Sequence, residues 1–465
     1  MNFGGLLSIA RSGLAASQAQ ISTTSQNVTN AQTPGYSRQR VTLVPGFPEQ
    51  LPQGTFGTGV IVDGVSRMRN QLLDTGYRRD AGNASFNEER RDALQGVEGV
   101  LGEPSSTGLA SSLEQFWSSW SDLSTNPTSS AARGVVRQRG AQVAAQLNQY
   151  GNQIVDAQTV ARTRLLETAD RVNALSSQVA DINARIVAAE AAGNEAPDMR
   201  DQRDLKVDEL ASLIGATAYA QPNGSVNVNV GGDSIVDGAN YKQVRISALT
   251  SDPTKLGIAL GDVPAASGKA ETMYQIGGQM AGTVDAYNNI YPAALTQLDG
   301  VAAALVTTTN SLHRTGFVRA TPAGNFFDST RTTARTITLD TGILSNVDNV
   351  TSSGVANQPG DNTVALRLSQ LRDTQTTVNG QVVSLNEGYR NVVASIATST
   401  NSADGTATAA RTLATQSDTR RESVKGVSID EEMVNLMKYQ QSYAAAARLI
   451  TVVDQMSQTL INMAR

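Results

Sequence analysis

The chain has 465 residues, with 42 acidic and 37 basic side chains and a formal net charge of −5. This length can hold about three domains, and the balanced charge, without a long basic run, gives no indication of nucleic-acid binding. The sequence has no cysteine and a single histidine, His313, which excludes disulfides, thiol nucleophiles and cysteine- or histidine-rich metal sites. No nucleotide-binding, zinc-protease or EF-hand motif occurs either, so we expect no catalytic residues and no cofactor.

The first residues, Met1-Asn2-Phe3, lack a basic region, and no long apolar stretch follows them. A Sec-type signal peptide is therefore not expected. No stretch approaches the roughly 20 apolar residues that cross a bilayer, so we expect no membrane insertion. We therefore expect a chain that is cytoplasmic, or that leaves the cell by a route that needs no cleaved signal.

Apolar residues near the start of the chain recur with a heptad spacing, which predicts a helix with one narrow apolar seam that ends near Ala31. The seam positions are Leu7, Leu14, Ile21 and Val28. Pro34 and Gly35 form a turn signal after this helix. Short extended runs at 41–44 and 60–62 then predict a hairpin.

The segment from 67 to 214 has mainly helical patterning, with a second heptad seam at 172–189. Pro197 fits the first turn of its last helix, and Gly215 fits the C-terminal end of that helix. From Ala216 the pattern changes, because apolar and polar residues alternate strictly at 225–230 and short apolar runs follow at 235–236 and 244–246. These runs predict the strands of a small β-rich insert.

Helical patterning returns at 271–313 and again at 362–421, where the polar stretch 398–406 predicts an interruption. Between these two segments, 315–360 is irregular, with one expected strand at 336–339. No internal repeat is present.

The final segment, 427–465, contains no glycine and no proline. Ser428 and Glu431 form a capping box at its start. Its seam residues are Leu436, Tyr439, Tyr443, Ala446, Ile450, Val453 and Leu460. Tyr439 and Tyr443 could form an aromatic binding patch, but packing within the seam is the favoured interpretation. We infer that this helix pairs with the N-terminal helix, or stacks with neighbouring molecules, in one coiled-coil layer.

These patterns predict a mainly α fold with a small β-rich insert, in which long terminal coiled-coil helices and an elongated helical body form nested, discontinuous domains. We expect a terminal coiled-coil domain at 1–38 and 427–465, a mainly helical body at 39–215, 264–314 and 361–426, and a β-rich outer insert at 216–263 and 315–360.

Two groups of polar residues have both a functional and a structural interpretation. Asp201, Arg203 and Asp204 could include a catalytic carboxylate pair, but a solvated or intrahelical ion pair is favoured. His313 could be a lone acid–base group, but a capping or loop role is favoured, because no cysteine lies nearby and no second histidine exists.

The stretch 25–36, SQNVTNAQTPGY, resembles the N-terminal signature shared by bacterial flagellar rod, hook and hook-associated proteins, with the turn residues Pro34, Gly35 and Tyr36. The stretch 428–443, SIDEEMVNLMKYQQSY, resembles their C-terminal signature. The middle of the chain is similar to the hook-associated protein 1 branch of this family, in the motifs at 201–204 (DQRD), 310–313 (NSLH) with Gly316, 324–327 (GNFF) and 359–362 (PGDN). The resemblance covers the whole chain except the β-rich insert.

The resemblance implies a structural subunit of the flagellum that forms a short layer between the hook and the filament. It implies export through the flagellar type III channel and a final location outside the cell at the hook–filament junction. The implied partners are the hook protein, a second junction protein (hook-associated protein 3), further copies of the chain, and a cytoplasmic export chaperone on the C-terminal segment.

Three alternatives stay open. The chain could be a hook or distal rod protein, an axial protein with hydrolytic activity, or a cytoplasmic coiled-coil module. The two terminal seams alone bury too little apolar surface to offset the cost of ordering two long helices. We therefore expect the ends of the chain to become rigid only among neighbouring subunits.

Overall fold

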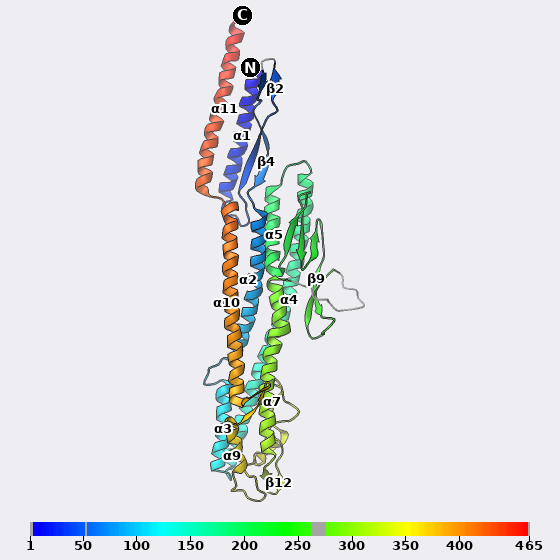
Figure 1. Ribbon diagram of the computed structural model, residues 1–465, viewed down its shortest axis with the longest axis vertical. Helices are drawn as coiled ribbons and strands as arrows, with labels where there is room; N and C mark the ends of the chain where they lie inside the picture. Colours follow the sequence, from blue (N-terminus) through cyan, green and yellow to red (C-terminus); the bar gives the residue numbers. More distant parts are fainter. Residues whose placement is uncertain (1–2, 52–53, 262–275, 464–465) are drawn as a thin grey trace.

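The computed structural model describes residues 3–51, 54–261 and 276–463. Long helices run along an extended rod, and both ends of the chain lie at the same end of that rod (Figure 1). Small antiparallel sheets lie against the helices. The predicted fold class, mainly α with long terminal helices and a small β-rich part, is confirmed.

The main helices are α1 (Phe3–Thr29), α2 (Gln71–Leu101), α3 (Leu109–Thr125), α4 (Ser130–Glu190), α5 (Pro197–Ile214), α6 (Gly278–Asp285), α7 (Tyr291–His313), α8 (Thr341–Ser345), α9 (Thr363–Ser369), α10 (Leu385–Lys425) and α11 (Ile429–Met463). A π-helical turn, Ala286–Ile290, joins α6 to α7, and 3₁₀ turns occur at Val347–Asn349 and Gln370–Arg372. The strands are β1 (Gln39–Pro45), β2 (Glu49–Leu51), β3 (Gly54–Phe56), β4 (Val60–Arg67), β5 (Thr217–Ala220), β6 (Val226–Val230), β7 (Asp233–Asp237), β8 (Asn240–Tyr241), β9 (Val244–Ala248), β10 (Leu256–Leu260), β11 (Phe317–Val318), β12 (Thr321–Pro322), β13 (Gln375–Val378) and β14 (Gln381–Ser384).

Local sequence signals explain where the longest helices begin and end. The Ser129 hydroxyl caps α4 by accepting a hydrogen bond from the Ala132 N–H at 3.1 Å, and Pro197 occupies the first turn of α5 as expected. Gly215 ends α5 with a left-handed φ of 71°. Helix α4 has 61 residues and buries its heptad seam, including Val172 and Val179, against the body and the β-rich part.

The expected helix at 362–421 is wrong in two respects. A hairpin, β13–β14, interrupts it, with Asn379 and Gly380 at positive φ in the turn; an Asn-Gly pair between extended runs is a hairpin signal. The helix α10 that follows then runs without a break through 398–406. Its threonines donate to the backbone carbonyl four residues earlier, as Thr400 does to Ile396 at 3.0 Å, so these polar residues stay within the helix.

The described residues form two hydrophobic cores at different heights of the rod. The larger one, at the end far from the termini, contains fully buried aromatic residues from α3 and from the segment after α7, including Phe116, Trp120, Phe326 and Phe327. The second core lies between α4, α5, α6 and the strands β6, β7, β9 and β10. The sequence pattern grouped 216–263 with 315–360 in one outer insert, and the structure corrects this.

The two segments pack in different cores because Phe326 and Phe327 fill the aromatic core beside Phe116, with ring centroids 5.6 and 6.0 Å away. The strand expected at 336–339 is also wrong, since only Leu339 makes an isolated bridge, to Phe327. Residues 262–263, and 271–275 of the helix expected at 271–313, lie outside the described residues.

The β-rich part consists of a four-stranded antiparallel sheet, in the order β5-β6-β7-β8, and a separate β9–β10 hairpin. Helical asparagines hold the β9–β10 hairpin to the body. Asn173 accepts from the Val244 N–H at 2.7 Å and donates to its carbonyl at 2.9 Å, and Asn288 does the same for Leu256 at 2.8 Å each. Each side-chain amide thus forms, with one strand residue, the two hydrogen bonds that a neighbouring strand would otherwise form.

His313 is fully buried at the end of α7. Its Nδ1–H donates to the Gly324 carbonyl at 2.8 Å, and its Nε2 accepts from the Thr351 N–H at 3.3 Å. Burial lowers the pKa of His313 to about 4, so the ring is neutral at pH 7. The residue therefore ties two loops to the aromatic core.

The helical segment Gly278–His313 has the length and composition that a membrane span requires, but half of its most apolar window is buried inside the protein. Leu298, Val301 and Leu305 of this segment belong to the larger core. Its apolar character is therefore explained by packing within the rod.

Candidate assembly interface at the chain termini

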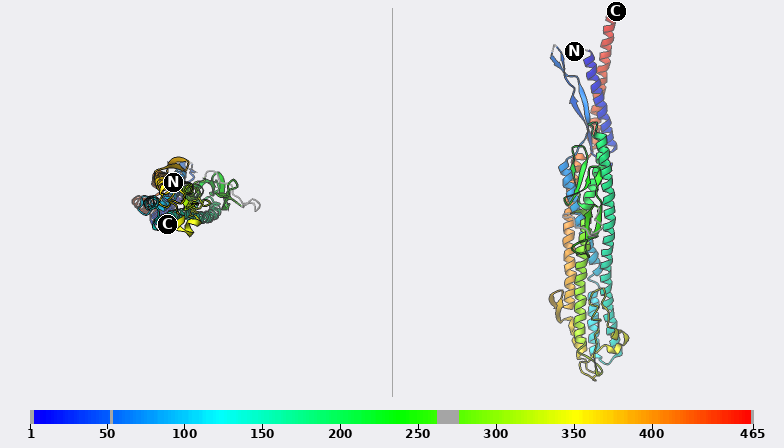
Figure 2. Two further views of the ribbon diagram at one scale, coloured as in Figure 1. Left: turned by 90° about the horizontal axis from the view of Figure 1, so that it is seen from below. Right: turned by 90° about the vertical axis from the view of Figure 1, so that its right-hand side faces the viewer.

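The two terminal helices lie side by side and antiparallel at one end of the rod (Figure 2). Two contacts fix their register. A Cβ at Gly13 would lie 3.8 Å from the Ala446 Cβ, and Asn27 donates to Glu432 at 3.0 Å. The pairing inferred from the heptad spacing is therefore seen within one chain.

Small and polar residues of α1 occupy the seam, while its larger apolar residues lie at the margin. The buried positions of α1 are Ala10, Ala16, Ser17, Thr23, Thr24 and Asn27. Of the predicted seam residues, Leu14, Ile21 and Val28 are half-buried and Leu7 is 36% exposed. Small side chains at the contact allow the two helix backbones to approach closely.

The predicted seam of α11 faces α1 over only part of its length. Ala446 and Val453 are buried, and Leu436, Tyr439 and Ile450 are half-buried. Tyr443 is 39% and Leu460 50% exposed. The register places Leu460 beyond Phe3, where the described part of α1 begins, so the last turns of α11 project past α1.

Further large apolar side chains on α11 are exposed outside the predicted seam. They are Ile429, Met433, Val434, Met437, Leu449, Val452, Met456, Ile461 and Met463. Helix α11 packs mainly against α1, so the described part of the chain leaves these residues uncovered. A helix with this much exposed apolar surface needs further partners.

Asn27, within the N-terminal signature, organises the turn that follows α1. It is 1% exposed, and its amide accepts from the Tyr36 hydroxyl at 2.8 Å and the Gln39 N–H at 2.9 Å. It donates to the Gln39 carbonyl at 2.9 Å as well as to Glu432. All four hydrogen bonds of one buried amide are satisfied, so only asparagine fits this position well.

The turn signature itself lies at the base of the terminal helices. Gly35 has a φ of 82°, and a Cβ there would lie 3.3 Å from the Leu205 side chain of α5. Pro34 is exposed, and Tyr36 is half-buried, with its pKa raised by burial and by nearby carboxylates including Asp198. These residues shape the connection between α1 and the hairpin β1–β4, where they line a cavity of about 270 Å³ against α5.

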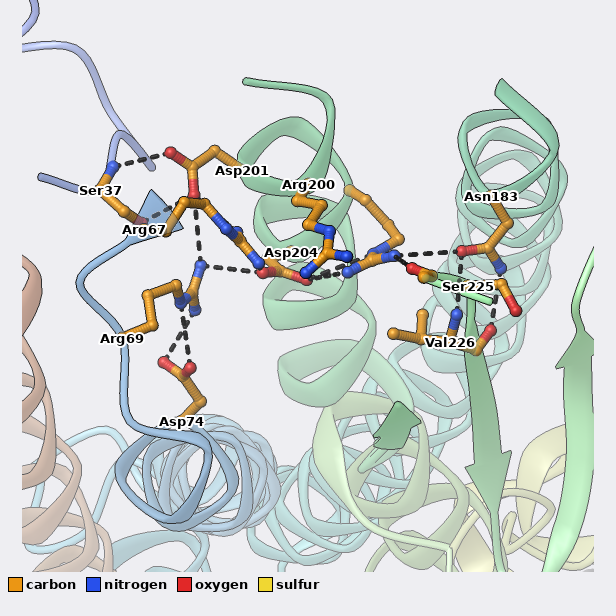
Figure 3. A network of polar contacts seen from close by, with 12 residues as sticks. Ser37, Arg67, Arg69, Asp74, Asn183, Arg200, Asp201, Asp204, Ser225 and Val226 are labelled. Carbon is orange, nitrogen blue, oxygen red and sulfur yellow. Dashed lines mark hydrogen bonds and ion pairs between the residues drawn. The ribbon is translucent and has the colours of Figure 1, made fainter. Parts of the chain in front are cut away.

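A buried charge network joins this terminal domain to the helical body (Figure 3). Asp201, on α5, accepts hydrogen bonds from the backbone N–H and the hydroxyl of Ser37, at 2.8 and 2.7 Å. Arg67, at the end of β4, contacts Asp201 at 2.7 Å and Asp204 at 2.8 Å. Arg69 contacts Asp204 at 3.0 Å. The turn, the hairpin and α5 are thereby joined through charge-assisted hydrogen bonds.

The geometry corrects the interpretation of these residues as solvated or intrahelical pairs. Asp201, Arg203 and Asp204 are buried, and their strongest contacts reach other elements. Burial alone would raise the pKa of Asp204, but the guanidinium groups of Arg69, Arg67 and Arg203 hold it well below its usual range. This carboxylate stays ionised and cannot serve as a general acid at neutral pH.

A sequence signal for the network was available. Asp201, Asp204 and Asp208 are three and four residues apart, so they share one face of α5. Asp208 extends the network, because it contacts Arg78 of α2 at 2.6 Å and Arg421 of α10 at 2.5 Å. The positions of the arginine partners had no periodic signal. Within the described ranges, no group of three or more carboxylate or histidine side chains is arranged to hold a metal ion.

Comparison with known proteins decides the family. A family model described as the flagellar hook-associated protein FlgK helical domain matches residues 94–327, and flagellar rod-protein models match 7–36 and 423–463. Flagellar hook-associated protein 1 of Bacillus subtilis is 31% identical over 98% of this chain and 97% of its own length. The chain belongs to the flagellar hook-associated protein 1 family.

Further relatives agree. Flagellar hook-associated protein 1 of Escherichia coli is 23% identical over 98% of this chain and 99% of its own length. The solved structure of the flagellar hook junction protein FlgK from Burkholderia pseudomallei has the same fold, with a TM-score of 0.65 and 15% identity over 77% of this chain and 100% of that chain. As a member of the hook-associated protein 1 family, this chain is a structural component of the bacterial flagellum. The rod-protein models match α1 with its turn and α11, the two segments that the fold brings together.

Proposed function

We propose that this chain forms the layer between hook and filament, and that its terminal helices α1 and α11 build that layer by packing against neighbouring subunits. The observation that carries this proposal is the exposed apolar surface of α11. Leu449, Val452 and Met456 are about half exposed on a helix that α1 covers on one side only. Burial of such side chains contributes about 1.5–3 kcal/mol each when it is complete.

The proposed partners follow from this position in the flagellum. They are the hook protein on one side, hook-associated protein 3 on the other, and further copies of the chain within the layer. Before export through the flagellar type III system, a cytoplasmic chaperone would cover the C-terminal segment, whose apolar residues are otherwise exposed. No catalytic step is part of this function.

The decisive test is the location of the protein along an intact flagellum, by specific labelling and electron microscopy. We expect label only where hook and filament meet. Label along the whole hook or in the rod would indicate a hook or rod protein, and protein found only inside the cell would indicate a cytoplasmic coiled-coil module. Either result would overturn the proposal.

A seam variant tests the role of the terminal helices. Ile450→Asp places a charge in the half-buried contact between α11 and α1, and we expect it to stop incorporation at the hook tip while the body keeps its melting temperature. The control is Thr408→Asp, which adds the same charge at an exposed position of α10 and should leave assembly normal. Normal filaments in the Ile450→Asp strain would contradict the assignment of Ile450 to the assembly seam.

A further inference from the structure

Two apolar patches, one on the hairpin β1–β4 and one on α11, have no cover within the described residues. The first, which we call the hairpin patch, consists of Phe47 and Val62, exposed by 87 and 37%. The second, which we call the α11 flank, consists of Leu449, Val452 and Met456. Large exposed apolar groups of this kind mark interaction sites when they lie close together.

The two patches belong to different elements that α1 separates. Helix α11 packs mainly on α1, and strands β1 and β4 of the hairpin also pack on α1. Figure 2 shows the hairpin and α11 as distinct arms beside α1. On a helix with 3.6 residues per turn, the residues of the α11 flank lie about 50–110° around from Ala446 and Val453, which face α1. The α1 helix of the same chain therefore leaves the flank open.

The patches lie at nearly the same height along the rod. Gly46, next to Phe47, donates its N–H to the Gly59 carbonyl at 2.9 Å, and the following Val60 N–H donates to the Ser12 hydroxyl at 3.2 Å. Phe47 is thus level with Ser12 of α1. Since Gly13 lies against Ala446, Leu449 and Val452 lie only about 5–9 Å further along α11, at 1.5 Å per residue.

Charges beside the patches have opposite signs. Glu49 follows Phe47 by two residues, and Arg448 precedes Leu449, and both side chains are exposed. One chain therefore carries two apolar patches at nearly the same height, one beside a negative charge and the other beside a positive charge. This is the arrangement that a repeating head-to-tail contact between identical copies requires.

We propose that the hairpin patch of one copy docks on the α11 flank of the next copy within the layer, with Glu49 beside Arg448. The proposal rests on the proposed function and names the surfaces that join adjacent subunits. A second copy fits better than another protein, because one chain supplies both complementary surfaces at matching height. Each copy then uses both surfaces, so the contact can continue around the layer.

Cysteine cross-linking tests the contact directly, because the natural chain has no cysteine. We expect assembled flagella that carry Phe47→Cys together with Val452→Cys to give disulfide-linked dimers and larger chains on oxidation. The control pair is Phe47→Cys with Asp454→Cys, an exposed position about 160° around α11 from Val452. It should give roughly fivefold less product, since a disulfide needs Cα atoms within about 7 Å.

Three results would overturn the docking contact: no cross-link in assembled flagella, equal yields for both pairs, or linkage of residue 47 to a different flagellar protein. Single-cysteine variants report on that last outcome. Correct labelling at the junction without the expected cross-link would contradict only the docking contact, whereas label elsewhere on the flagellum would contradict the proposed function.

Charge exchange gives an independent test. We expect Glu49→Arg and Arg448→Glu each to lower the amount of protein retained at the hook tip, and the double variant to restore it, because the pair is re-formed with reversed signs. Retention of the double variant at or below the level of the single variants would overturn the pairing. Unchanged melting of the body verifies that each variant is folded.

Discussion

The two ends of the rod differ in how their apolar side chains are buried. At the end far from the termini, Phe116, Trp120 and Phe326 are fully buried, and their rings lie 5.4–6.1 Å apart. At the terminal end, the seam of α1 is formed by small and polar residues, and most of the large apolar side chains of α11 remain exposed. One end completes a core within the chain, and the other leaves its apolar surface for neighbouring molecules.

The comparison separates the part of the molecule that folds by itself from the part that becomes ordered on assembly. The charge network around Asp201 and Asp204 lies between the two ends and joins the terminal domain to the body through α5. Breaking one partner of such a buried pair costs about 3–5 kcal/mol. The body can therefore fold as a stable unit and hold the base of the terminal helices in place, while the helices themselves gain most of their order in the layer.

The largest expected difference between the two ends is in amide hydrogen exchange of the dilute, isolated subunit. We expect amides of α3 and of the first half of α4 to exchange only through global unfolding, which corresponds to about 5 kcal/mol or more. Amides of α1 and α11 should exchange rapidly, because few apolar groups protect them. Strong protection throughout both terminal helices would contradict the proposed dependence on neighbours.

The next largest effect is expected from Phe326→Ala in the aromatic core. The side chain is fully buried against Phe116 and Trp120, and truncation of a buried phenylalanine costs about 3–5 kcal/mol. The measurement is denaturant unfolding of the body, monitored by tryptophan fluorescence. Phe47→Ala, at an exposed position, is the control and should change the stability of the isolated subunit by less than about 0.5 kcal/mol.

Heptad and alternating patterns predicted most of the elements, because they report directly which side of a helix or strand is buried. They gave α1, α11, the hairpin β1–β4 and the strands β6 and β7 close to their observed bounds. The same patterns could not show that Phe326 packs with α3, since that contact joins residues far apart in the sequence.

The candidate interface was predictable only in part. The spacing identified the helices, but it assigned Leu7 and Leu460 to the seam, where both are exposed. Burial in α1 follows the close approach of the two backbones, which favours Ala10 and Ser17 over the larger residues beside them. Asn27 was part of the family signature, but its four hydrogen bonds depend on Glu432 and the turn, which no local pattern encodes.

A smaller effect is expected from pH at the aromatic end. The pKa of His313 is about 4 in the folded chain and about 6.5 when unfolded. The unfolded chain therefore binds more protons as the pH falls below 6.5, and stability decreases until about pH 4. Between pH 7 and pH 5 the loss should be about 2 kcal/mol. Denaturant unfolding of the wild type and of His313→Gln at both pH values measures it, and an equal loss in the variant would exclude His313 as the cause.

The smallest effect concerns two glycines, one in the contact between the terminal helices and one in the body. A Cβ at Gly13 would be 3.8 Å from the Ala446 Cβ, an ordinary contact, whereas a Cβ at Gly82 of α2 would be 2.8 Å from the Ala211 backbone carbonyl. We expect Gly13→Ala to stabilise α1 by about 0.5–1 kcal/mol through helix propensity, seen as slower amide exchange around residue 13. Gly82→Ala should instead lower the melting temperature of the body, because the carbonyl of α5 must move. If both substitutions were destabilising to a similar degree, α1 and α11 would be packed as tightly as the body, and the contrast between the two ends would rest on exposure of α11 alone.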